Sequence, residues 1–137
     1  LKVLENTGLQ GRWQQLQEHP KVICDTAHNA AGLKSVMDQL HQEQFKHLHV
    51  VLGIVNDKDL TEMLPLFPKS ATYYFCKPNI PRGLKAEILK EKSKECNLTG
   101  AVYVSVSDAY QAALANADAS DFIYIGGSTF VVAEILE

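Results

Sequence analysis

The sequence predicts an α/β domain built on a doubly wound, mostly parallel sheet, with helices on both faces in a three-layer arrangement. Short apolar runs alternate with helical patterns about five times along the chain. The runs over residues 47–53 and 122–125 are almost continuously apolar, as in strands that are covered on both faces. The chain has 137 residues, of which 46% are hydrophobic and 21% charged. This is enough for one buried core, so we expect a single domain over residues 1–137.

The predicted elements follow one another with short polar connections. Residues 1–18 are predicted to form a hairpin or an edge ribbon that leads into the sheet. A helix after residue 104 is indicated by Ser105 and Asp108, which have the spacing of a capping box. We expect strands at 22–24, 47–53, 71–76, 102–104 and 122–125, and helices at about 30–42, 60–67, 84–95, 105–117 and 130–136.

Composition and charge argue against several classes of protein. The formal net charge of −3 gives no basic surface for nucleic acid. No apolar run approaches the roughly 20 residues that span a bilayer, and no signal peptide is recognisable, so we expect no membrane partner. Cys24, Cys76 and Cys96 include no C-x-x-C pair, which indicates reduced thiols in a cytoplasmic protein. Because the chain begins with Leu1, we expect it to be a piece of a longer protein.

Four polar loops follow the predicted strands, and we expect them to converge. The carboxyl ends of parallel strands joined by right-handed crossovers lie at one edge of the sheet, where α/β proteins bind their ligands. The four loops span residues 25–29, 57–59, 79–82 and 126–129. Their convergence predicts a ligand site more strongly than any one loop does.

Asp25 and His28 form a D-x-x-H pattern directly after the strand at 22–24. This short pattern alone is explained equally well by a structural role, with Asp25 capping the following helix and His28 as an exposed turn residue, and by a binding site. In a binding site, Asp25 would accept a hydrogen bond from a ribose hydroxyl, and His28 would bind a carboxylate or a phosphate. A metal site is disfavoured, because His47 and His49 lie on the next strand and no further ligand cluster accompanies them.

Gly126-Gly127-Ser128-Thr129 joins the last predicted strand to the last helix. Glycines let the backbone approach a ligand closely, and a helix N-terminus favours anions. The alternative is a tight turn capped by Ser128 or Thr129. The segment has neither the spacing of a dinucleotide-binding fingerprint nor that of a P-loop.

Several cations lie in or near the predicted loops. Lys58 stands between Asp57 and Asp59, and either binds a carboxylate or belongs to a solvated charged loop. Arg82 follows a proline in a stiff loop and either forms a bidentate pair with an anion or is a surface charge. Arg12 precedes a tryptophan and either stacks on it at the surface or reaches a phosphate.

The remaining histidines have no partner that is visible in the sequence. We therefore expect His19, His41, His47 and His49 at the surface or at strand edges. The Tyr and Phe residues at 73–75 are expected in the core.

Taken in order, these motifs resemble the C-terminal domain of the Mur ligase superfamily, and within it the folylpolyglutamate synthase / dihydrofolate synthase family. The resemblance covers essentially the whole chain. It departs at Ala30, where proline is usual, and at Thr26, where folate enzymes often have glycine. The motifs that carry it are Gly11-Arg12-Trp13, Asp25-Thr26-Ala27-His28-Asn29, Gly53 followed by Asp57-Lys58-Asp59, Pro81-Arg82 and Gly126-Gly127-Ser128.

The resemblance implies a Rossmann-like domain of an ATP-dependent amide-bond ligase. In such enzymes ATP phosphorylates a carboxylate of dihydropteroate or a reduced folate, and the amino group of glutamate attacks the acyl phosphate. The P-loop and the ligands of Mg²⁺ belong to an N-terminal ATPase domain, which this chain lacks. We therefore expect the chain to fold alone and to be inactive alone.

The resemblance also implies a role for each matching residue. No residue acts as a nucleophile and none binds a metal. Arg12 and Asp25 would bind ATP, and His28, Ser128, Lys58 and Arg82 would bind glutamate. Supporting roles fall to Asn29, Asp57, Asp59, Gly126 and Gly127.

Two other readings stay open. The departures at Thr26 and Ala30 leave room for a peptidoglycan ligase that extends a UDP-linked muramyl acceptor. A different class would be a non-catalytic nucleotide-binding or signalling module of the receiver type. A receiver needs an acidic pair after its first strand and a lysine after its fifth, and this sequence has neither.

Overall fold

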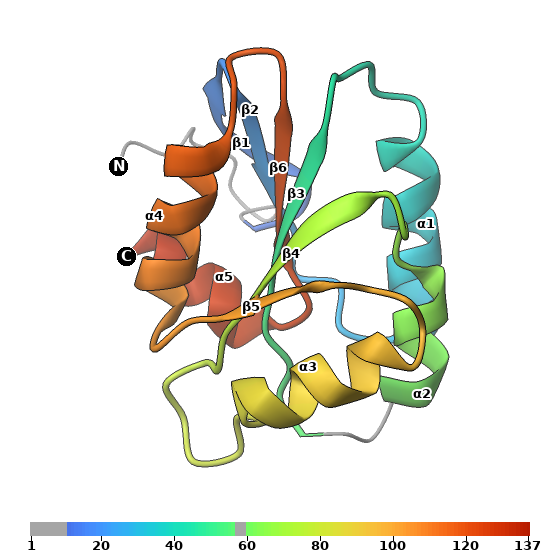
Figure 1. Cartoon of the computed structure of the whole chain (residues 1–137), viewed down its shortest axis with the longest axis vertical. Helices are drawn as coiled ribbons and strands as arrows, with labels where there is room; N and C mark the ends of the chain where they lie inside the picture. Colours follow the sequence, from blue (N-terminus) through green and yellow to red (C-terminus); the bar gives the residue numbers. More distant parts are fainter. Residues whose placement is uncertain (1–10, 57–59) are drawn as a thin grey trace.

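A six-stranded sheet separates two layers of helices in the computed structural model of the chain, which describes residues 11–56 and 60–137 (Figure 1). The strand order is β1-β2-β6-β3-β4-β5. β1 is antiparallel to β2, and the other strands are parallel to one another, which confirms the predicted sheet. Of the edge ribbon predicted for residues 1–18, the part at 14–18 is confirmed, and residues 1–10 lie outside the described residues. The strands are β1 (Gln14–Glu18), β2 (Lys21–Cys24), β3 (Leu48–Leu52), β4 (Ala71–Phe75), β5 (Gly100–Val102) and β6 (Phe122–Gly126).

The helices pack two separate cores against the two faces of the sheet. One face is covered by α1 (Ala30–Leu40), by α2 (Leu60–Met63) with the 3₁₀ turn Leu64–Leu66, and by α3 (Ala86–Lys94). The opposite face is covered by α4 (Val106–Asn116) and α5 (Thr129–Leu136). β3 and β6 are buried along their whole length, because both faces are covered. This is the three-layer arrangement that the alternating pattern predicts.

The order of the strands creates a crevice at the carboxyl edge of the sheet. β6 lies between β2 and β3. The chain leaves β2 and β3 toward the layer of α1 and α2, but it leaves β6 toward the layer of α5 on the other face (Figure 1). Neighbouring strands whose connections depart to opposite faces leave a gap between their loops, and ligands of α/β proteins bind in such gaps.

Several predicted boundaries differ from the structure by one or more residues, and three of the differences have a physical reason in the fold. β5 ends at Val102 rather than continuing to 104, because the chain must turn before Ser105 caps α4. The helix expected at 60–67 changes to a 3₁₀ turn after Met63, since Pro65 has no N–H to donate. α3 begins at Ala86, because Lys85 is its N-cap and has a non-helical ψ of 136°.

Two histidines expected at the surface or at strand edges have partners inside the fold. His49 is buried between Tyr74 and Asp121 and hydrogen-bonds to both, so the prediction for this residue was wrong. His47 is half-buried and hydrogen-bonds to Thr72. The aromatic residues at 73–75 lie in the core as expected. No helix in the described part of the chain is long and apolar enough to span a membrane.

Candidate functional site

Two neighbouring cavities open where the carboxyl ends of β2, β6 and β3 meet. The smaller cavity has a volume of about 430 Å³ and the larger cavity about 800 Å³. They share His28, Asn29 and Thr129 in their walls. Residues from three of the four loops that were expected to converge line these cavities, namely 25–29, 79–82 and 126–129.

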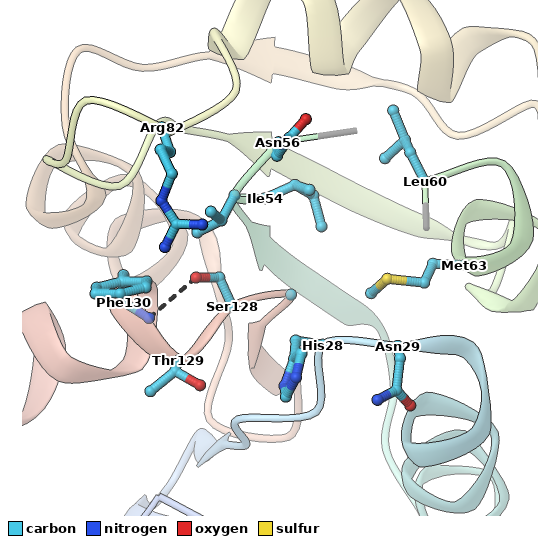
Figure 2. A pocket seen from close by; sticks show the side chains of 12 residues that line it. His28, Asn29, Ile54, Asn56, Leu60, Met63, Arg82, Ser128, Thr129 and Phe130 are labelled. Atoms are coloured by element: carbon cyan, nitrogen blue, oxygen red, sulfur yellow. Dashed lines mark hydrogen bonds between the residues drawn. The ribbon is translucent and has the colours of Figure 1, made fainter. Parts of the chain in front are cut away.

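The smaller cavity has a polar side and an apolar side. Figure 2 shows Arg82, Ser128 and Phe130 on one side and Leu60 and Met63 on the other. A few polar groups set against an apolar wall are typical of small-molecule sites, because the wall excludes water and the polar groups orient the ligand. The full lining is His28, Asn29, Ile54, Val55, Asn56, Leu60, Met63, Arg82, Gly127, Ser128, Thr129 and Phe130.

Arg82 is the cation of the smaller cavity. Its side chain is exposed, and its guanidinium makes no hydrogen bond or ion pair with the part of the chain that the structure describes. The loop that carries it is fixed, since Val55 and Gly83 form an antiparallel bridge. A free guanidinium on a fixed loop is suited to a bidentate pair with a carboxylate or a phosphate.

His28 presents one ring nitrogen for a ligand. Its Nδ1 lies 3.2 Å from the carbonyl oxygen of Thr26. Because a carbonyl only accepts, this contact assigns the proton to Nδ1 and leaves Nε2 to accept in the neutral ring or to donate in the protonated ring. The side chain is exposed between the two cavities, so it can serve a ligand in either of them.

The glycine turn after β6 brings the N-terminus of α5 to the smaller cavity. Gly127 has a φ of +100°, and a Cβ at this position would lie 2.5 Å from the carbonyl oxygen of Gly53. The turn therefore requires glycine. Ser128 caps α5: its Oγ accepts from the N–H of Phe130 at 3.0 Å, and its side chain is only 2% exposed. The helix end contributes a partial positive charge next to Arg82.

Asp25 joins two turns beneath the larger cavity. Its Oδ2 accepts from the N–H of Trp13 at 2.6 Å, and its Oδ1 accepts from the N–H of Ala27 at 2.8 Å. The N–H of Thr26 also donates to the carbonyl of Gly11, so the turn before β1 is held against the turn after β2. The carboxylate is 6% exposed, and each of its oxygens keeps a second lone pair for a ligand hydroxyl.

Arg12 is the cation of the larger cavity. Its side chain is exposed and forms no hydrogen bond or ion pair within residues 11–56 and 60–137. Trp13 is half-buried beside it and contacts Phe122 with ring centroids 6.3 Å apart, and no stacking of Arg12 on Trp13 occurs among the described residues. The larger cavity therefore combines a free cation, a hydrogen-bond acceptor and an aromatic side chain.

Asn29 supports the site through the backbone of α1. Its Oδ1 accepts from the N–H of Gly32 at 2.9 Å, which makes Asn29 the N-cap of the helix. The alternative that Asp25 caps this helix was wrong. Because its side chain fixes the start of α1, Asn29 holds the wall that separates the two cavities.

The fourth predicted loop cannot be placed. Asp57, Lys58 and Asp59 lie outside the described residues, so their predicted roles stay predictions. The flanking residues Asn56 and Leu60 both line the smaller cavity.

Sequence reasoning missed several residues of the smaller cavity. Asn56 has a φ of +66°, and an asparagine just past a strand end was an available signal for such a turn. Leu60 and Met63 have the pattern of core residues and are 3% and 1% exposed, so only the structure shows that they also form a wall. Phe130 is 39% exposed at the cavity, and its exposure depends on where α5 lies.

The thiols near the site are unsuited to nucleophilic chemistry. Burial, and after it the charge of Asp25, raises the pKa of Cys24 to about 12. Burial raises the pKa of Cys76 likewise, to about 12. Both are protonated at neutral pH, and a thiol is a far weaker nucleophile than a thiolate. No cluster of His, Cys, Asp and Glu able to hold a metal ion occurs among the residues that the structure describes.

Comparison with known proteins gives a consistent set of relatives. The family model "Mur ligase, glutamate ligase domain" matches residues 11–129. The "Probable bifunctional folylpolyglutamate synthase/dihydropteroate synthase" of Haloferax volcanii is 35% identical over 135 residues, which cover 96% of this chain and 16% of that protein. The "Dihydrofolate synthase/folylpolyglutamate synthase" of Escherichia coli is 32% identical over 131 residues, which cover 94% of this chain and 30% of that protein.

Solved structures of similar proteins share the fold. "E.coli FolC in complex with DHPP and ADP" has a TM-score of 0.85 and 31% identity, and the match covers 93% of this chain and 30% of that chain. A bifunctional folylpolyglutamate synthase/dihydrofolate synthase "with Mn, AMPPNP and L-Glutamate bound" has a TM-score of 0.83 and 27% identity. The match covers 97% of this chain and 32% of that chain. The chain thus spans less than a third of the length of these relatives.

Proposed function

The chain belongs to the Mur ligase, glutamate ligase domain family, and from this premise we propose that it is the C-terminal domain of an ATP-dependent ligase that adds glutamate to dihydropteroate or a reduced folate. One observation carries the proposal: two adjacent cavities share the turn that contains His28, and each is lined by an arginine that has no partner among residues 11–56 and 60–137. A ligase of this kind must bring a nucleotide and an amino acid together at one place, and neighbouring cavities suit that task.

The larger cavity would take part of the nucleotide. Arg12 has the free guanidinium that a phosphate group needs, and Asp25 has lone pairs for a ribose hydroxyl. The similar FolC proteins were solved with ADP or AMPPNP bound. No acidic cluster for Mg²⁺ lies within the described residues, so this chain supplies no metal ligand in the proposal, and Mg²⁺ would be bound by an N-terminal ATPase domain.

The smaller cavity would take the incoming glutamate. Glutamate carries two carboxylates, and Arg82 together with the N-terminus of α5 offers positive charge for them. His28 would contact the ligand through Nε2, and Ser128 would act mainly by fixing the helix end, because its Oγ already caps α5. Lys58, between Asp57 and Asp59, would add a second cation, and Gly126 and Gly127 would let the backbone approach the ligand.

The chemistry requires positioning rather than a nucleophilic side chain. ATP would transfer its γ-phosphoryl group to the acceptor carboxylate and leave as ADP, the amino group of glutamate would attack the acyl phosphate, and inorganic phosphate would leave. Cations held close to the developing charge and the exclusion of water lower the barrier of such a transfer. We place the protein in the cytoplasm, which agrees with three cysteines that are all free.

The test is ADP release by the full-length protein that contains this chain. It is supplied with ATP, Mg²⁺ and glutamate, and with dihydropteroate, a reduced folate or a UDP-muramyl acceptor in turn. Turnover is expected with dihydropteroate or the folate, and His28→Ala should lower kcat/KM for glutamate by at least about tenfold. His41→Ala, an exposed histidine just past the end of α1, is the matched control and should leave turnover unchanged.

Other outcomes would contradict the proposal. Turnover with the muramyl acceptor alone would assign the protein to the peptidoglycan branch of the superfamily. No turnover with any acceptor would favour a non-catalytic module. Turnover by the isolated 137-residue chain at an enzyme-like rate would show that no ATPase domain is needed.

A further inference from the structure

We propose that Glu134, a half-buried residue in the C-terminal half of α5, is a positioning residue for Arg82. Its carboxylate would hold the loop of Arg82 at a fixed place relative to the N-terminus of the same helix. The inference rests on the proposed function only for the identity of the ligand, a carboxylate of glutamate. The arrangement of Glu134, the loop and the helix is independent of it.

The key contact joins α5 to the loop that follows β4. The N–H of Asn79 donates to Oε2 of Glu134 at 2.7 Å. This is a short, charge-assisted hydrogen bond to a backbone group. Asn79 itself is exposed, whereas the preceding Pro78 is buried, so the bond to Glu134 attaches an exposed part of the loop to the helix.

The loop has a second attachment on the other side of Arg82. The N–H of Leu84 donates to the carbonyl of Ile54 at 2.8 Å, and Val55 and Gly83 form an antiparallel bridge. Arg82 thus lies between a fixed point on α5 and a fixed point on the loop after β3. With both ends held, the backbone of Arg82 has little freedom to move away from the smaller cavity.

α5 carries both the helix end that faces the smaller cavity and Glu134, to which the loop of Arg82 is bonded. The N-terminal end of α5 presents Ser128, Thr129 and Phe130 to the smaller cavity. Glu134 lies five residues after Thr129, which corresponds to about 7.5 Å along the helix axis. Because a helix does not stretch, a loop bound at Glu134 stays at a constant distance from the helix end. This would set the spacing between the guanidinium and the positive end of the helix.

In the described part of the chain, the N–H of Asn79 is the hydrogen-bond partner of Glu134. It forms no salt bridge within the residues that the structure describes, and it does not line the smaller cavity. Its charge is close enough to the buried Cys76 to raise the pKa of that thiol in addition to the effect of burial. The carboxylate is therefore held over the carboxyl end of β4, where the loop of Arg82 begins.

The test compares single and double variants of the full-length protein under saturating ATP and acceptor. Glu134→Ala is expected to raise KM for glutamate about three- to tenfold and to change kcat less than about twofold. Glu134→Gln should be close to wild type, because its amide oxygen can still accept from Asn79. In the Arg82→Ala background, Glu134→Ala should add no further increase, since the two residues would act through one contact. Glu91→Ala, an exposed acid on α3, is the control.

The possible results separate this inference from the proposed function. If Arg82→Ala raises KM for glutamate but Glu134→Ala does not, the inference is overturned and the proposed function stands. If Arg82→Ala itself has no effect on KM, the role of Arg82 fails and the inference fails with it. If Glu134→Ala and Glu134→Gln are equally impaired and add fully to Arg82→Ala, Glu134 acts through its charge or through general stability, which also overturns the inference.

Discussion

At the carboxyl edge of the sheet, Arg82 and His28 are exposed and make at most one hydrogen bond each with the described residues. At the amino edge, by contrast, His49 and Asp121 are buried and hydrogen-bonded to each other. Nε2 of His49 lies 2.9 Å from Oδ2 of Asp121, and its Nδ1 lies 2.8 Å from the hydroxyl of Tyr74. Both edges therefore contain a histidine near charged or polar groups. At the amino edge both ring nitrogens of His49 are bonded, whereas at the carboxyl edge Arg82 and Nε2 of His28 line cavities and have no partner among the described residues.

This difference shows how a functional histidine can be told from a structural one. A buried polar group must be hydrogen-bonded within the fold, because the desolvation of an unpaired group is costly. His49 meets this requirement and has no ring nitrogen left for a ligand. His28 has one nitrogen left, and it lies where loops from three strands converge. The bonds left on the ring, rather than the residue type, separate the two histidines.

The largest effect on stability is expected from the removal of Asp121 at the amino edge. Asp121→Ala leaves His49 buried without its carboxylate and removes the acceptor for the N–H of Asp118. We expect the free energy of unfolding, measured by urea denaturation of the chain, to fall by about 2–4 kcal/mol. Arg82→Ala should change it by less than about 0.5 kcal/mol, because this side chain is exposed and unpaired among the residues described.

A control for this experiment lies in the same loop. Asp118 is 68% exposed and pairs with Lys46 at the surface, at 3.3 Å. Asp118→Ala should cost less than about 1 kcal/mol, as exposed ion pairs do. If Asp118→Ala and Asp121→Ala were equally destabilising, burial of the His49–Asp121 pair would not be what matters at the amino edge.

A smaller effect is expected from the backbone of the carboxyl edge. In Gly127→Ala the new Cβ would meet the carbonyl of Gly53, and the residue would keep a φ that favours glycine. The expected loss of stability is about 1–3 kcal/mol. Because the distortion lies at the start of α5, KM for glutamate of the full-length protein should rise as well, whereas Asp121→Asn at the opposite edge should leave it unchanged. A normal KM in Gly127→Ala would argue that the helix end takes no part in binding.

Much of the carboxyl edge could be predicted because its signals are local. The motif after β2, the glycine turn after β6 and the continuous apolar runs of β3 and β6 are each contained in a few residues. The family assignment from these motifs is confirmed by the family model. The order of the strands follows from which helix packs on which face, and no local pattern states that β6 lies between β2 and β3.

The amino edge could not be predicted in the same way. His49 and Asp121 are 72 positions apart, and only the parallel pairing of β3 with β6 brings their elements together. In the sequence, His49 interrupts an apolar strand and has the appearance of a strand-edge residue. The range predicted for β5 was wrong for a related reason. The apolar run 102–104 suggested the strand, but the pairing with β4 and the position of the Ser105 cap set its end.

The smallest expected effect is a pH dependence at the amino edge. Burial opposes ionisation of Asp121, but hydrogen bonds from His49 and from the N–H of Asp118, together with the charges of His49 and His47, lower its pKa below 3.8. The folded protein therefore binds this proton less tightly than the unfolded chain does. Its stabilising contribution is complete above about pH 4 and is lost as the pH falls through the folded pKa.

Asp121→Asn keeps the shape of the side chain and removes its charge. At pH 6–7 the variant should be about 1 kcal/mol less stable than wild type, because a hydrogen bond to a charged group is stronger than one to a neutral group. Urea denaturation at a series of pH values should show this gap closing below pH 4. Asp118→Asn, its exposed neighbour, should show a smaller gap at every pH. A gap in Asp121→Asn that stays constant down to pH 2 would mean that the carboxylate charge adds nothing, and that the amino edge is held by shape and neutral hydrogen bonds alone.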